Sequence, residues 1–351
     1  MAEGAAVSAD GMCFLAADVG GTNARIALVR VGDGGRIGVL AYTKYPCGEY
    51  PSLTAILAEF IATQTRAGAD PGGFERMVIA SAGVVLDDEV INSNLPWRIS
   101  LPELRRKLRL RVLHVINDFA AAAHGAQRLD PAESRLLTPG VEVAEPGPAL
   151  VIGPGTGLGA AVCIPHPRGT VVLPTEAGMA SFAPGSAREI EILRWLQQRA
   201  RHVTTEQLMS GPGLVNLYEA ICAIGGKQPQ LRAPAAITEA ARRGDAIARD
   251  AVLGFCSLLG SVIGDLALIS SARSVHVAGG IVPQLLDFLP QSDFRMRLVD
   301  KGAMRAVLER VPVRLIENER LGVIGAASWY LQHLEDQANT DTAGNGQAGA
   351  A

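Results

Sequence analysis

Two glycine-rich stretches of the sequence have the composition of sites that bind phosphate. The first, DVGGTNAR, runs from Asp18 to Arg25, and the second, GPGTGLG, runs from Gly153 to Gly159. Each lies between two apolar runs, which predicts a β-hairpin whose turn carries the glycines. Glycine lets a backbone approach phosphate closely, and consecutive N–H groups in such a turn bind anions. Only the first stretch brings a charge, because Asp18 stands where the second has Gly153; this acid can orient the hydrated Mg²⁺ of a nucleotide.

An alternative reading makes each stretch an ordinary hairpin turn, since glycine and asparagine are favoured wherever φ is positive. For a single turn we favour this interpretation. For two matched turns we favour the interpretation that they bind a nucleotide. A P-loop is excluded, because G-x-x-x-x-G-K-[ST] is absent. The pattern Gly155, Gly157, Ala160, with Glu176 further on, resembles a dinucleotide-binding fingerprint. However, the chain continues as a second strand and not as the helix that such a site requires.

Asp118 stands between the apolar strand VLHVI and the predicted helix FAAAAHGA. An acid in this place can be the N-cap of the helix or a catalytic group at a strand end. The helix N-terminus favours an anion in either role. The spacing alone leaves both interpretations open.

The composition indicates a two-domain protein that acts through specific sites. The chain has 351 residues, 48% of them hydrophobic and 19% charged, with a formal net charge of -3. This length exceeds what one core usually serves, and the charge gives no general attraction to nucleic acid or to an anionic membrane. The arginine-rich stretch RRKLRLR is expected to be an amphipathic helix running into a strand. The apolar stretch from Phe255 to Ala272 is expected to be a buried helix whose glycines permit close packing.

The elements predicted around these residues form an α/β chain. The first hairpin and the strand GRIGVLAYTKY precede the helix SLTAILAEFIATQTR, whose apolar residues repeat at helical spacing. Strands are predicted at MVIASAG and VLHVIND, with the helix SLPELRRKLR before the second. The equal plans of Phe14–Val29 and Ala149–Ile164 indicate an internal duplication. Residues 1–12 and 337–351 are small, polar and aperiodic, so we expect both to be disordered.

With AGGIVP at Ala278–Pro283, the two glycine-rich stretches resemble the phosphate and adenosine motifs of the actin-like ATPase superfamily. Together with INDF at Ile116–Phe119 and LMSGPGLVNLY at Leu208–Tyr218, they are similar to bacterial glucokinases of the type unrelated to the ROK proteins. The ROK branch carries a Cys-rich zinc motif that this chain lacks. The resemblance implies two ribonuclease-H-like α/β domains flanking a cleft. The small domain would comprise residues 13–129 and 321–336, and the large domain residues 130–320.

The same resemblance implies ATP-dependent phosphorylation of a hexose, with glucose as the expected acceptor and glucose 6-phosphate as the product. Asp118 is then the base that accepts the proton of the sugar 6-hydroxyl, and Asp18 holds Mg²⁺ through water. The implied sugar ligands are Asn94, Asn117, Asp118, Glu176 and Glu206. The implied ATP-binding residues are Asp18, Gly20, Gly21, Thr22, Asn23, Gly155, Thr156, Gly157, Gly279 and Gly280. The family further implies a cytoplasmic homodimer that binds neither nucleic acid nor membrane.

Two segments of the implied sugar site depart from the family pattern. INSNLPW matches a family stretch with Ser93 in place of Thr, and Trp97 there either packs against sugar or belongs to a turn after a hairpin whose tip is Asp87 and Asp88. Taken alone, Glu206 would be an ordinary exposed helix residue. The sugar loop, LPTEAGMASFAP from Leu173 to Pro184, keeps Glu176 but has Met179 where the family has a histidine that hydrogen-bonds the sugar.

A thioether is at best a weak acceptor and donates no proton. The unpaired sugar hydroxyl that this leaves would cost on the order of 1 to 3 kcal/mol, unless water or another side chain replaces the histidine. The sequence therefore supports an active hexose kinase first. A catalytically weak or inactive paralogue that binds sugar in a regulatory role is the alternative.

Overall fold

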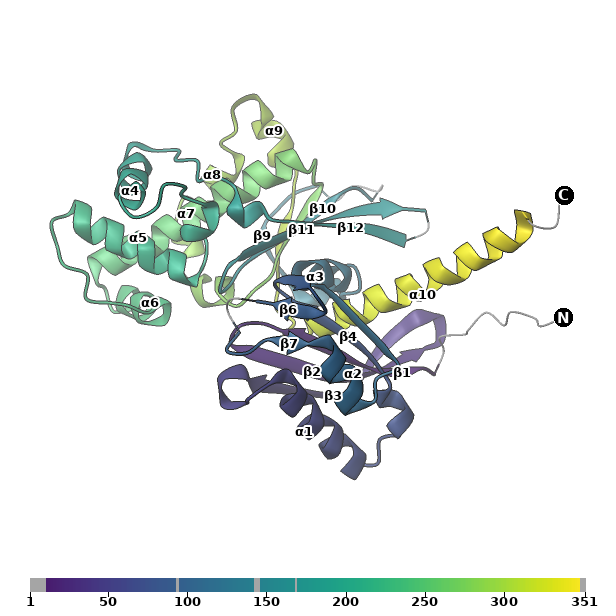
Figure 1. Ribbon diagram of the computed structural model, residues 1–351. Helices are drawn as coiled ribbons and strands as arrows, with labels where there is room; N and C mark the ends of the chain where they lie inside the picture. Colours follow the sequence, from purple (N-terminus) through teal and green to yellow (C-terminus); the bar gives the residue numbers. More distant parts are fainter. Residues whose placement is uncertain (1–10, 93–94, 142–145, 168, 348–351) are drawn as a thin grey trace. The chain divides into compact units, whose positions relative to one another are not determined.

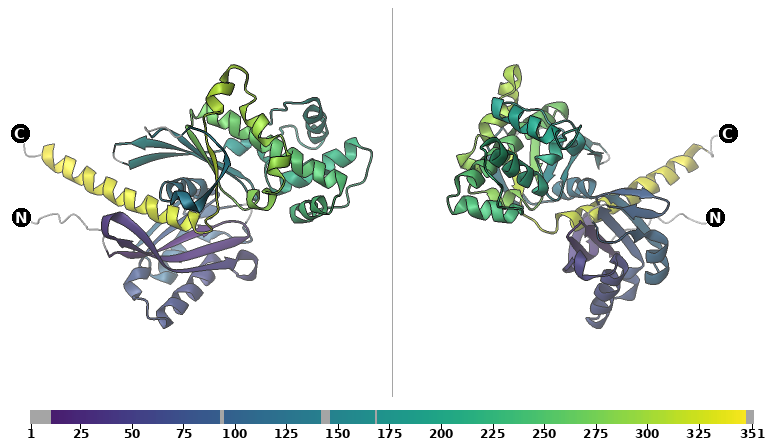
Figure 2. Two further views of the ribbon diagram at one scale, coloured as in Figure 1. Left: turned by 180° about the vertical axis from the view of Figure 1, so that it is seen from behind. Right: turned by 60° about the vertical axis from the view of Figure 1, so that its left-hand side comes forward.

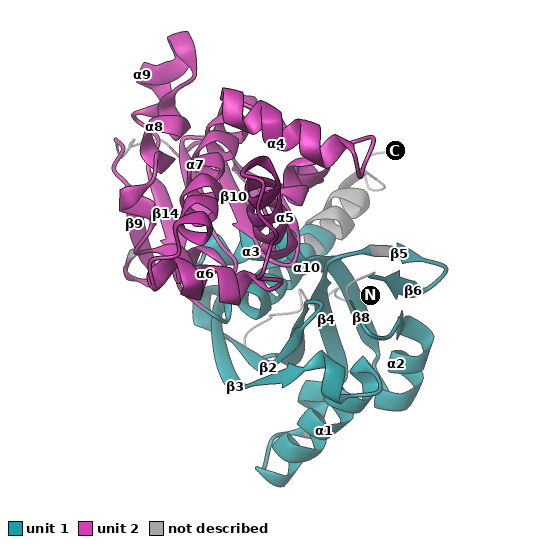
Figure 3. Ribbon diagram, turned by 90° about the vertical axis from the view of Figure 1, so that its left-hand side faces the viewer, with its two compact units in different colours: residues 1–129, 319–351 teal, residues 130–318 magenta. Residues whose placement is uncertain are grey.

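The structure, a computed structural model, describes residues 11–92, 95–141, 146–167 and 169–347. The chain divides into two compact units, each built on a mixed β-sheet (Figure 3). Residues 1–129 and 319–351 form unit 1, and residues 130–318 form unit 2. Unit 1 is therefore discontinuous in sequence, because the last helix of the chain belongs to it.

Unit 1 contains a five-stranded sheet of order β3-β2-β1-β4-β8. Strands β1, β2 and β3 pair antiparallel, whereas β1, β4 and β8 run parallel. A small second sheet, β5-β6-β7, has the predicted tip at Asp87 and Asp88, where φ is 48° and 60°. The elements of unit 1 are β1 (Cys13–Val19), β2 (Asn23–Gly32), β3 (Arg36–Pro46), α1 (Leu53–Arg66), β4 (Arg76–Ser81), β5 (Val84–Leu86), β6 (Glu89–Ile91), β7 (Ile99–Ser100), α2 (Leu101–Leu108), β8 (Val112–Asn117), α3 (Asp118–Ala126) and α10 (Leu321–Gln347) (Figure 1).

The strand β1 is buried on both faces, which explains its unbroken apolar sequence. Alternate side chains enter different cores: Leu15 packs in the cluster that contains α1 and α2 residues, and Phe14 packs in the cluster with α10. The ring of Phe14 meets that of Tyr330 edge-on, with centroids 5.0 Å apart. The start of α10 lies beside α3 and the strands of unit 1 (Figure 2). The sheet is thus covered by helices on both faces.

Unit 2 repeats the strand order of unit 1. Its sheet runs β12-β11-β10-β13-β14-β9, so that an antiparallel β10-β11-β12 meander again adjoins two parallel strands. This agrees with the internal duplication predicted from the two hairpin regions. The elements of unit 2 are β9 (Ser134–Thr138), β10 (Ala149–Pro154), β11 (Leu158–His166), β12 (Gly169–Thr175), α4 (Ala187–Gln197), α5 (Gly211–Ile224), α6 (Pro234–Arg242), α7 (Ala246–Ile269), β13 (Ser274–Val277), α8 (Phe294–Val299), α9 (Arg305–Leu308) and β14 (Val313–Ile316).

Helix α7 contains the apolar stretch that the sequence predicts to be a close-packed helix. By length and composition alone it is sufficient to cross a membrane, and half of its most apolar window is buried inside the protein. Its glycines approach the backbone of α8: a Cβ on Gly260 would collide with the carbonyl of Phe294, and one on Gly264 with that of Leu298. Lys301 also pairs with Asp265 at 2.6 Å. The predicted role of the glycines is therefore confirmed.

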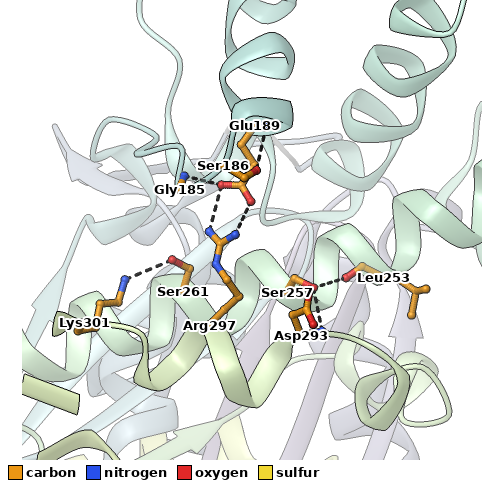
Figure 4. A network of polar contacts seen from close by, with 9 residues as sticks. All are labelled: Gly185, Ser186, Glu189, Leu253, Ser257, Ser261, Asp293, Arg297 and Lys301. Atoms are coloured by element: carbon orange, nitrogen blue, oxygen red, sulfur yellow. Dashed lines mark hydrogen bonds and ion pairs between the residues drawn. The ribbon is translucent and has the colours of Figure 1, made fainter.

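A buried ion pair joins α4 to α8 in unit 2 (Figure 4). The guanidinium of Arg297 donates to both carboxylate oxygens of Glu189, at 2.6 and 3.0 Å, and the N–H of Gly185 donates to the same carboxylate at 2.6 Å. Both charged side chains are only 11–13% exposed. Burial raises the pKa of Glu189, but the hydrogen bonds from Arg297 and Gly185 outweigh it, so the net pKa lies below the usual value.

Two expectations about the termini are corrected by the structure. Residues 1–10 lie outside the described part of the chain, but Gly11 and Met12 are hydrogen-bonded to Val31 of β2, at 2.8 and 2.9 Å. At the other end, α10 continues to Gln347 although disorder is predicted from Gln337. An existing helix gains one hydrogen bond for each residue it adds, so it can extend through a segment with no apolar periodicity.

Candidate active site

The first hairpin turn, residues 18–23, closes at the end of β1. The N–H of Gly20 donates to the carbonyl of Asn23 at 3.0 Å. A Cβ added to Gly20 would meet nothing closer than 3.7 Å, and the backbone of this glycine is not in the left-handed region. Neither φ nor internal packing therefore requires glycine here. The absence of a side chain at Gly20 leaves room for another group to approach the backbone.

The second hairpin turn, residues 154–158, shows the same property at Gly155. A Cβ there would meet nothing closer than 4.0 Å, and φ is again not positive. The turn is held by hydrogen bonds from Gly155 N to Gly157 O at 2.7 Å and from Gly211 N to Gly155 O at 2.8 Å. The chain continues into β11, which confirms that a dinucleotide-binding helix is absent at this point. Positive φ therefore does not explain the glycine at position 20 or at position 155.

The adenosine motif lies against the second hairpin turn in unit 2. Ala278 N donates to Ile152 O of β10 at 2.8 Å. Gly279 has a φ of +89°, and a Cβ on it would lie 2.7 Å from the carbonyl oxygen of Pro154. Gly280, in contrast, has open space around its Cβ position. The structure thus brings Gly279 and Gly280 together with the turn that contains Gly155, Thr156 and Gly157.

Asp18 ends the apolar part of β1 and pairs with Arg25 on β2. The Arg25 Nη1 to Asp18 Oδ2 distance is 3.2 Å, and the Asp18 side chain is 19% exposed. Burial raises the pKa of Asp18, and the Arg25 guanidinium opposes that rise. Gly322 in the first turn of α10 packs so closely on the carboxyl group that any side chain there would collide with it. Asp18 is therefore held in place by β2 and by the start of α10.

A single carboxylate is a suitable donor set for Mg²⁺ that arrives with a nucleotide. In the part of the chain that the structure describes, no group of three His, Cys, Asp or Glu side chains could hold a metal ion. Mg²⁺ commonly keeps several waters and binds through one or two carboxylates together with substrate phosphates. Asp18 at the edge of the first hairpin turn fits that mode.

Asn117 and Asp118 lie where β8 becomes α3. Asn117 is the N-cap of the helix: its Oδ1 accepts from Ala120 N at 2.9 Å. Asp118 is the first helical residue, and its Oδ1 accepts from Phe119 N at 2.9 Å. The N-cap interpretation of Asp118 is therefore wrong, because the neighbouring amide takes that place. The half-buried carboxylate remains at the positive end of the helix dipole.

The first hairpin turn and Asp118 lie at one edge of the unit 1 sheet. Val19 at the end of β1 is in register with Ser81 of β4, which is in register with Asn117 of β8. The buried hydroxyl of Ser81 donates to the carbonyl of Val19 at 3.1 Å. Ligands of open α/β sheets bind outside the carboxyl ends of the parallel strands. Unit 1 therefore positions its candidate phosphate turn and its candidate base at the edge where such ligands bind.

Trp97 acts within the protein as an anchor. Its indole N–H donates to the carbonyl oxygens of Cys47 and Tyr50, at 3.2 and 3.0 Å, and its ring packs on the cluster that includes α1 and α2 residues. Of the two interpretations of this residue, the structure favours the structural one. Asn94, the proposed sugar ligand of the same segment, lies outside the described residues.

The sugar loop in unit 2 turns through a short 3-10 helix, η5 (Ala177–Met179). Glu176 precedes it and is exposed, while its carbonyl accepts from Met179 N at 2.9 Å. The Met179 side chain is 45% exposed. The ring Nε2 of His202 lies 3.2 Å from the carbonyl oxygen of Met179. An imidazole is therefore adjacent to the loop that lacks the family's histidine, although it contacts the backbone.

Glu206 lies in the 3-10 helix η6 (Thr205–Gln207) and points at the second hairpin turn. Its Oε2 accepts from Leu158 N at 2.8 Å. The expectation of an ordinary exposed helix residue is wrong, because the side chain is half-buried against Gly157 and Leu158. Unit 2 thus brings Glu206 to the second hairpin turn. Sequence reasoning missed this contact, as it missed Cys47 and Gly322, because each pairs with residues distant in the chain.

Two mixed sheets that share an antiparallel meander beside parallel strands, each with a glycine turn, agree with a sugar kinase of the actin-like ATPase superfamily. The profile of the glucokinase family matches residues 15–333, and the chain belongs to this family. A "Glucokinase-like protein" of Xylella fastidiosa is 42% identical over 323 residues, which is 91% of this chain and 94% of that protein. A "Glucokinase" of Chromohalobacter salexigens is 38% identical, over 89% of this chain and 95% of the other.

A solved glucokinase structure from an Antarctic psychrotroph has the same fold. It superposes with a TM-score of 0.77 at 32% sequence identity and covers 90% of this chain and 98% of its own. The mixed α/β architecture described above is therefore that of a glucokinase over nearly the whole chain.

Proposed function

We propose that this protein transfers the γ-phosphoryl group of ATP to the 6-hydroxyl of a hexose, with glucose as the principal acceptor. The observation that carries the proposal is the pair of glycines Gly20 and Gly155. Each lies in a hairpin turn, neither has a positive φ, and neither has an internal neighbour that a Cβ would displace. Open backbone at two matched turns suits the phosphates of a nucleotide.

In the proposed arrangement the two units are ribonuclease-H-like domains that flank a cleft. ATP would lie against Asp18 to Asn23 of the first turn, against Gly155 to Gly157 of the second and against Gly279 and Gly280. Mg²⁺ bound with it would neutralise phosphate charge. The sugar would contact Asn94, Asn117, Asp118, Glu176 and Glu206. Because the Oδ1 of Asn117 caps α3, its amide N–H groups are the part available to a sugar hydroxyl.

The chemistry requires one bond to form and one to break. The sugar O6 bonds to the γ-phosphorus while the bond from that phosphorus to the bridging oxygen of ADP breaks, and the O6 proton passes to the Asp118 carboxylate. Alignment and charge neutralisation supply most of the acceleration in such transfers. Asp118, fixed at the first turn of α3 beside the capping Asn117, orients the hydroxyl. Closure around glucose would exclude water and prevent hydrolysis of ATP.

An assay of ADP release with Mg-ATP tests this proposal. We expect sugar-dependent turnover in a panel of glucose, mannose, fructose, glucosamine and N-acetylglucosamine, with glucose preferred and with turnover lost in Asp118→Asn. Absence of turnover with every sugar, in protein shown to be folded, would contradict the kinase function. Small-angle scattering with and without saturating glucose tests closure: unchanged dimensions would argue against it.

A second function is favoured by two observations. The sugar loop presents Met179 where a hydrogen-bonding side chain is expected, and the relative at 42% identity carries the name "Glucokinase-like protein". Both are compatible with a catalytically weak paralogue that binds sugar in a regulatory role. Calorimetric glucose binding without turnover would establish that role. We further propose that the protein acts in the cytoplasm as a homodimer; sedimentation equilibrium measures the second property.

A further inference from the structure

The carboxylate of Glu206 forms a hydrogen bond that its proposed contact with sugar does not explain. Its Oε2 accepts from the backbone N–H of Leu158 at 2.8 Å. Leu158 is the first residue of β11 and therefore ends the second hairpin turn. A charged acceptor makes this bond stronger than an ordinary backbone hydrogen bond. The bond fixes the end of the turn that leads into the sheet.

The backbone of Glu206 reaches the other end of the same turn. Its carbonyl accepts from the hydroxyl of Ser210 at 2.8 Å, and that hydroxyl oxygen accepts from Gly213 N at 3.0 Å, which caps α5. The first residue of α5, Gly211, donates its N–H to Gly155 O at 2.8 Å. Gly155 and Leu158, at the two ends of the turn, are thus both connected to η6.

Helix η6 is in turn bonded to the sugar loop. Both the N–H and the hydroxyl of Thr205 donate to the carbonyl of Ala180, at 2.8 and 3.1 Å. Phe182 N donates to Val203 O at 2.9 Å. A capping box between Thr204 and Gln207 closes the short helix on itself. The position of Glu206 is therefore determined by the sugar loop on one side and by α5 on the other.

Two glycines are required by this packing. A Cβ on Gly157 would overlap the carboxylate of Glu206, and a Cβ on Gly178 would overlap the carbonyl of Leu158. The phosphate turn, the sugar loop and η6 consequently meet without intervening side chains. The Glu206 carboxylate therefore contacts the turn directly.

We propose that Glu206 is a positioning residue that couples the sugar loop to the second phosphate turn. Its Oε2 holds the turn through Leu158 N–H, while its Oε1, for which the described residues offer no hydrogen-bond partner, receives a sugar hydroxyl. One carboxylate then serves both substrates, and occupancy by sugar orders the nucleotide turn. The inference rests on the proposed kinase function, because it takes the second turn as a phosphate site and Glu206 as a sugar ligand.

Equilibrium titration with Mg-ADP, without and with saturating glucose, tests the coupling and requires no turnover. Glu206→Ala removes the acceptor, so we expect Mg-ADP affinity to fall on the order of tenfold, and the effect of glucose on that affinity to be lost. Glu206→Gln keeps a carbonyl oxygen for Leu158 N–H and should retain nucleotide affinity within about threefold. Glu176→Ala is the matched control, because this exposed acid does not contact the turn: glucose affinity should fall and Mg-ADP affinity should not change.

Hydrogen exchange gives a second readout that does not depend on ligands. In Glu206→Ala, and in Glu206→Asp if the alanine variant does not fold, amide exchange in the segment 155–160 should accelerate, while Glu176→Ala leaves it unchanged. Wild-type Mg-ADP affinity and wild-type exchange in a folded Glu206→Ala variant would overturn the inference and leave the kinase function intact. If the wild-type protein itself does not bind Mg-ADP, both the inference and the proposed function are wrong.

Discussion

Trp97 and Cys47 connect two segments of unit 1 that sequence reasoning treats separately. Trp97 donates its indole N–H to the Cys47 carbonyl at 3.2 Å, and Cys47 donates its own backbone N–H to the Thr22 carbonyl at 2.9 Å. The Cys47 thiol also lies 3.4 Å from the carbonyl oxygen of Gly20. The segment that ends in Trp97 is thereby tied to the first hairpin turn through a single intervening residue.

The variant Trp97→Phe distinguishes this anchoring role from a sugar-packing role. The phenyl ring retains most of the apolar contact but cannot donate to Cys47 or Tyr50, so we expect stability to fall by about 1 to 2 kcal/mol. The KM for glucose should change less than about twofold, because an anchoring ring makes no contact with sugar. Calorimetric unfolding and initial-rate kinetics measure the two quantities. A large rise in KM at unchanged stability would instead make Trp97 a sugar-packing surface.

Replacing Met179 by histidine should strengthen sugar binding. A histidine supplies the hydrogen-bonding nitrogen that the thioether lacks, and the gain should be on the order of tenfold in glucose affinity. The Met179 side chain is 45% exposed and histidine is no larger than methionine, so the imidazole has room. Met179→Leu is the control, because it changes the side chain without adding a donor. Equal glucose affinities in the histidine, leucine and wild-type proteins, measured by calorimetry, would mean that another group already satisfies that hydroxyl.

Removing Arg297 should destabilise unit 2 strongly. In Arg297→Leu the Glu189 carboxylate stays buried without its guanidinium partner, and loss of one partner of a buried pair costs about 3 to 5 kcal/mol. The exposed pair Arg305–Glu309, at 2.9 Å on adjacent turns, provides the matched control. Arg305→Leu should change stability by less than about 1 kcal/mol. Similar unfolding temperatures for the two variants would show that the buried pair stabilises the protein no more than the exposed pair does.

The buried His124 should make the protein less stable in acid. Burial, with a smaller contribution from Arg128, lowers the pKa of His124 from its usual value of 6.5 to about 4. Between these values the unfolded chain binds more protons than the folded one, so stability falls as pH drops below about 6.5. His124→Asn should remove this contribution, and the stability difference between variant and wild type should shift by about 3 kcal/mol between pH 7 and pH 4. A pH-independent difference in urea unfolding would mean that His124 has the same pKa in the folded and the unfolded state.

The elements that the sequence predicts well are those encoded locally. The hairpins around Asp18 and Gly155, the tip at Asp87 and Asp88 and the helix that starts at Asp118 all follow from apolar runs interrupted by small or polar residues. The sequence also predicts the packing role of the α7 glycines, because small residues at helical spacing leave room for a second backbone.

Contacts between distant segments were not predictable in the same way. Nothing near Glu206 in the sequence indicates its bond to Leu158, because a short polar segment can point its carboxylate to solvent equally well. Likewise, nothing in the sequence around Gly322 indicates that a side chain at this position would collide with Asp18 of β1. Asn117 is the N-cap of α3 because its side chain reaches Ala120 N from outside the helix. The sequence offers Asn117 and Asp118, two adjacent side chains of equal length, and does not decide which of them caps the helix.

The discontinuity of unit 1 has a consequence for biosynthesis. The ribosome makes Phe14 before unit 2, and it makes Tyr330, whose ring contacts that of Phe14, after unit 2. At about 5–20 residues per second the intervening roughly 300 residues take about 15 to 60 s. During that time unit 2, which is continuous, can fold completely, while the part of the unit 1 sheet that α10 covers stays exposed. A nascent chain that stops before α10 would present this apolar face to chaperones.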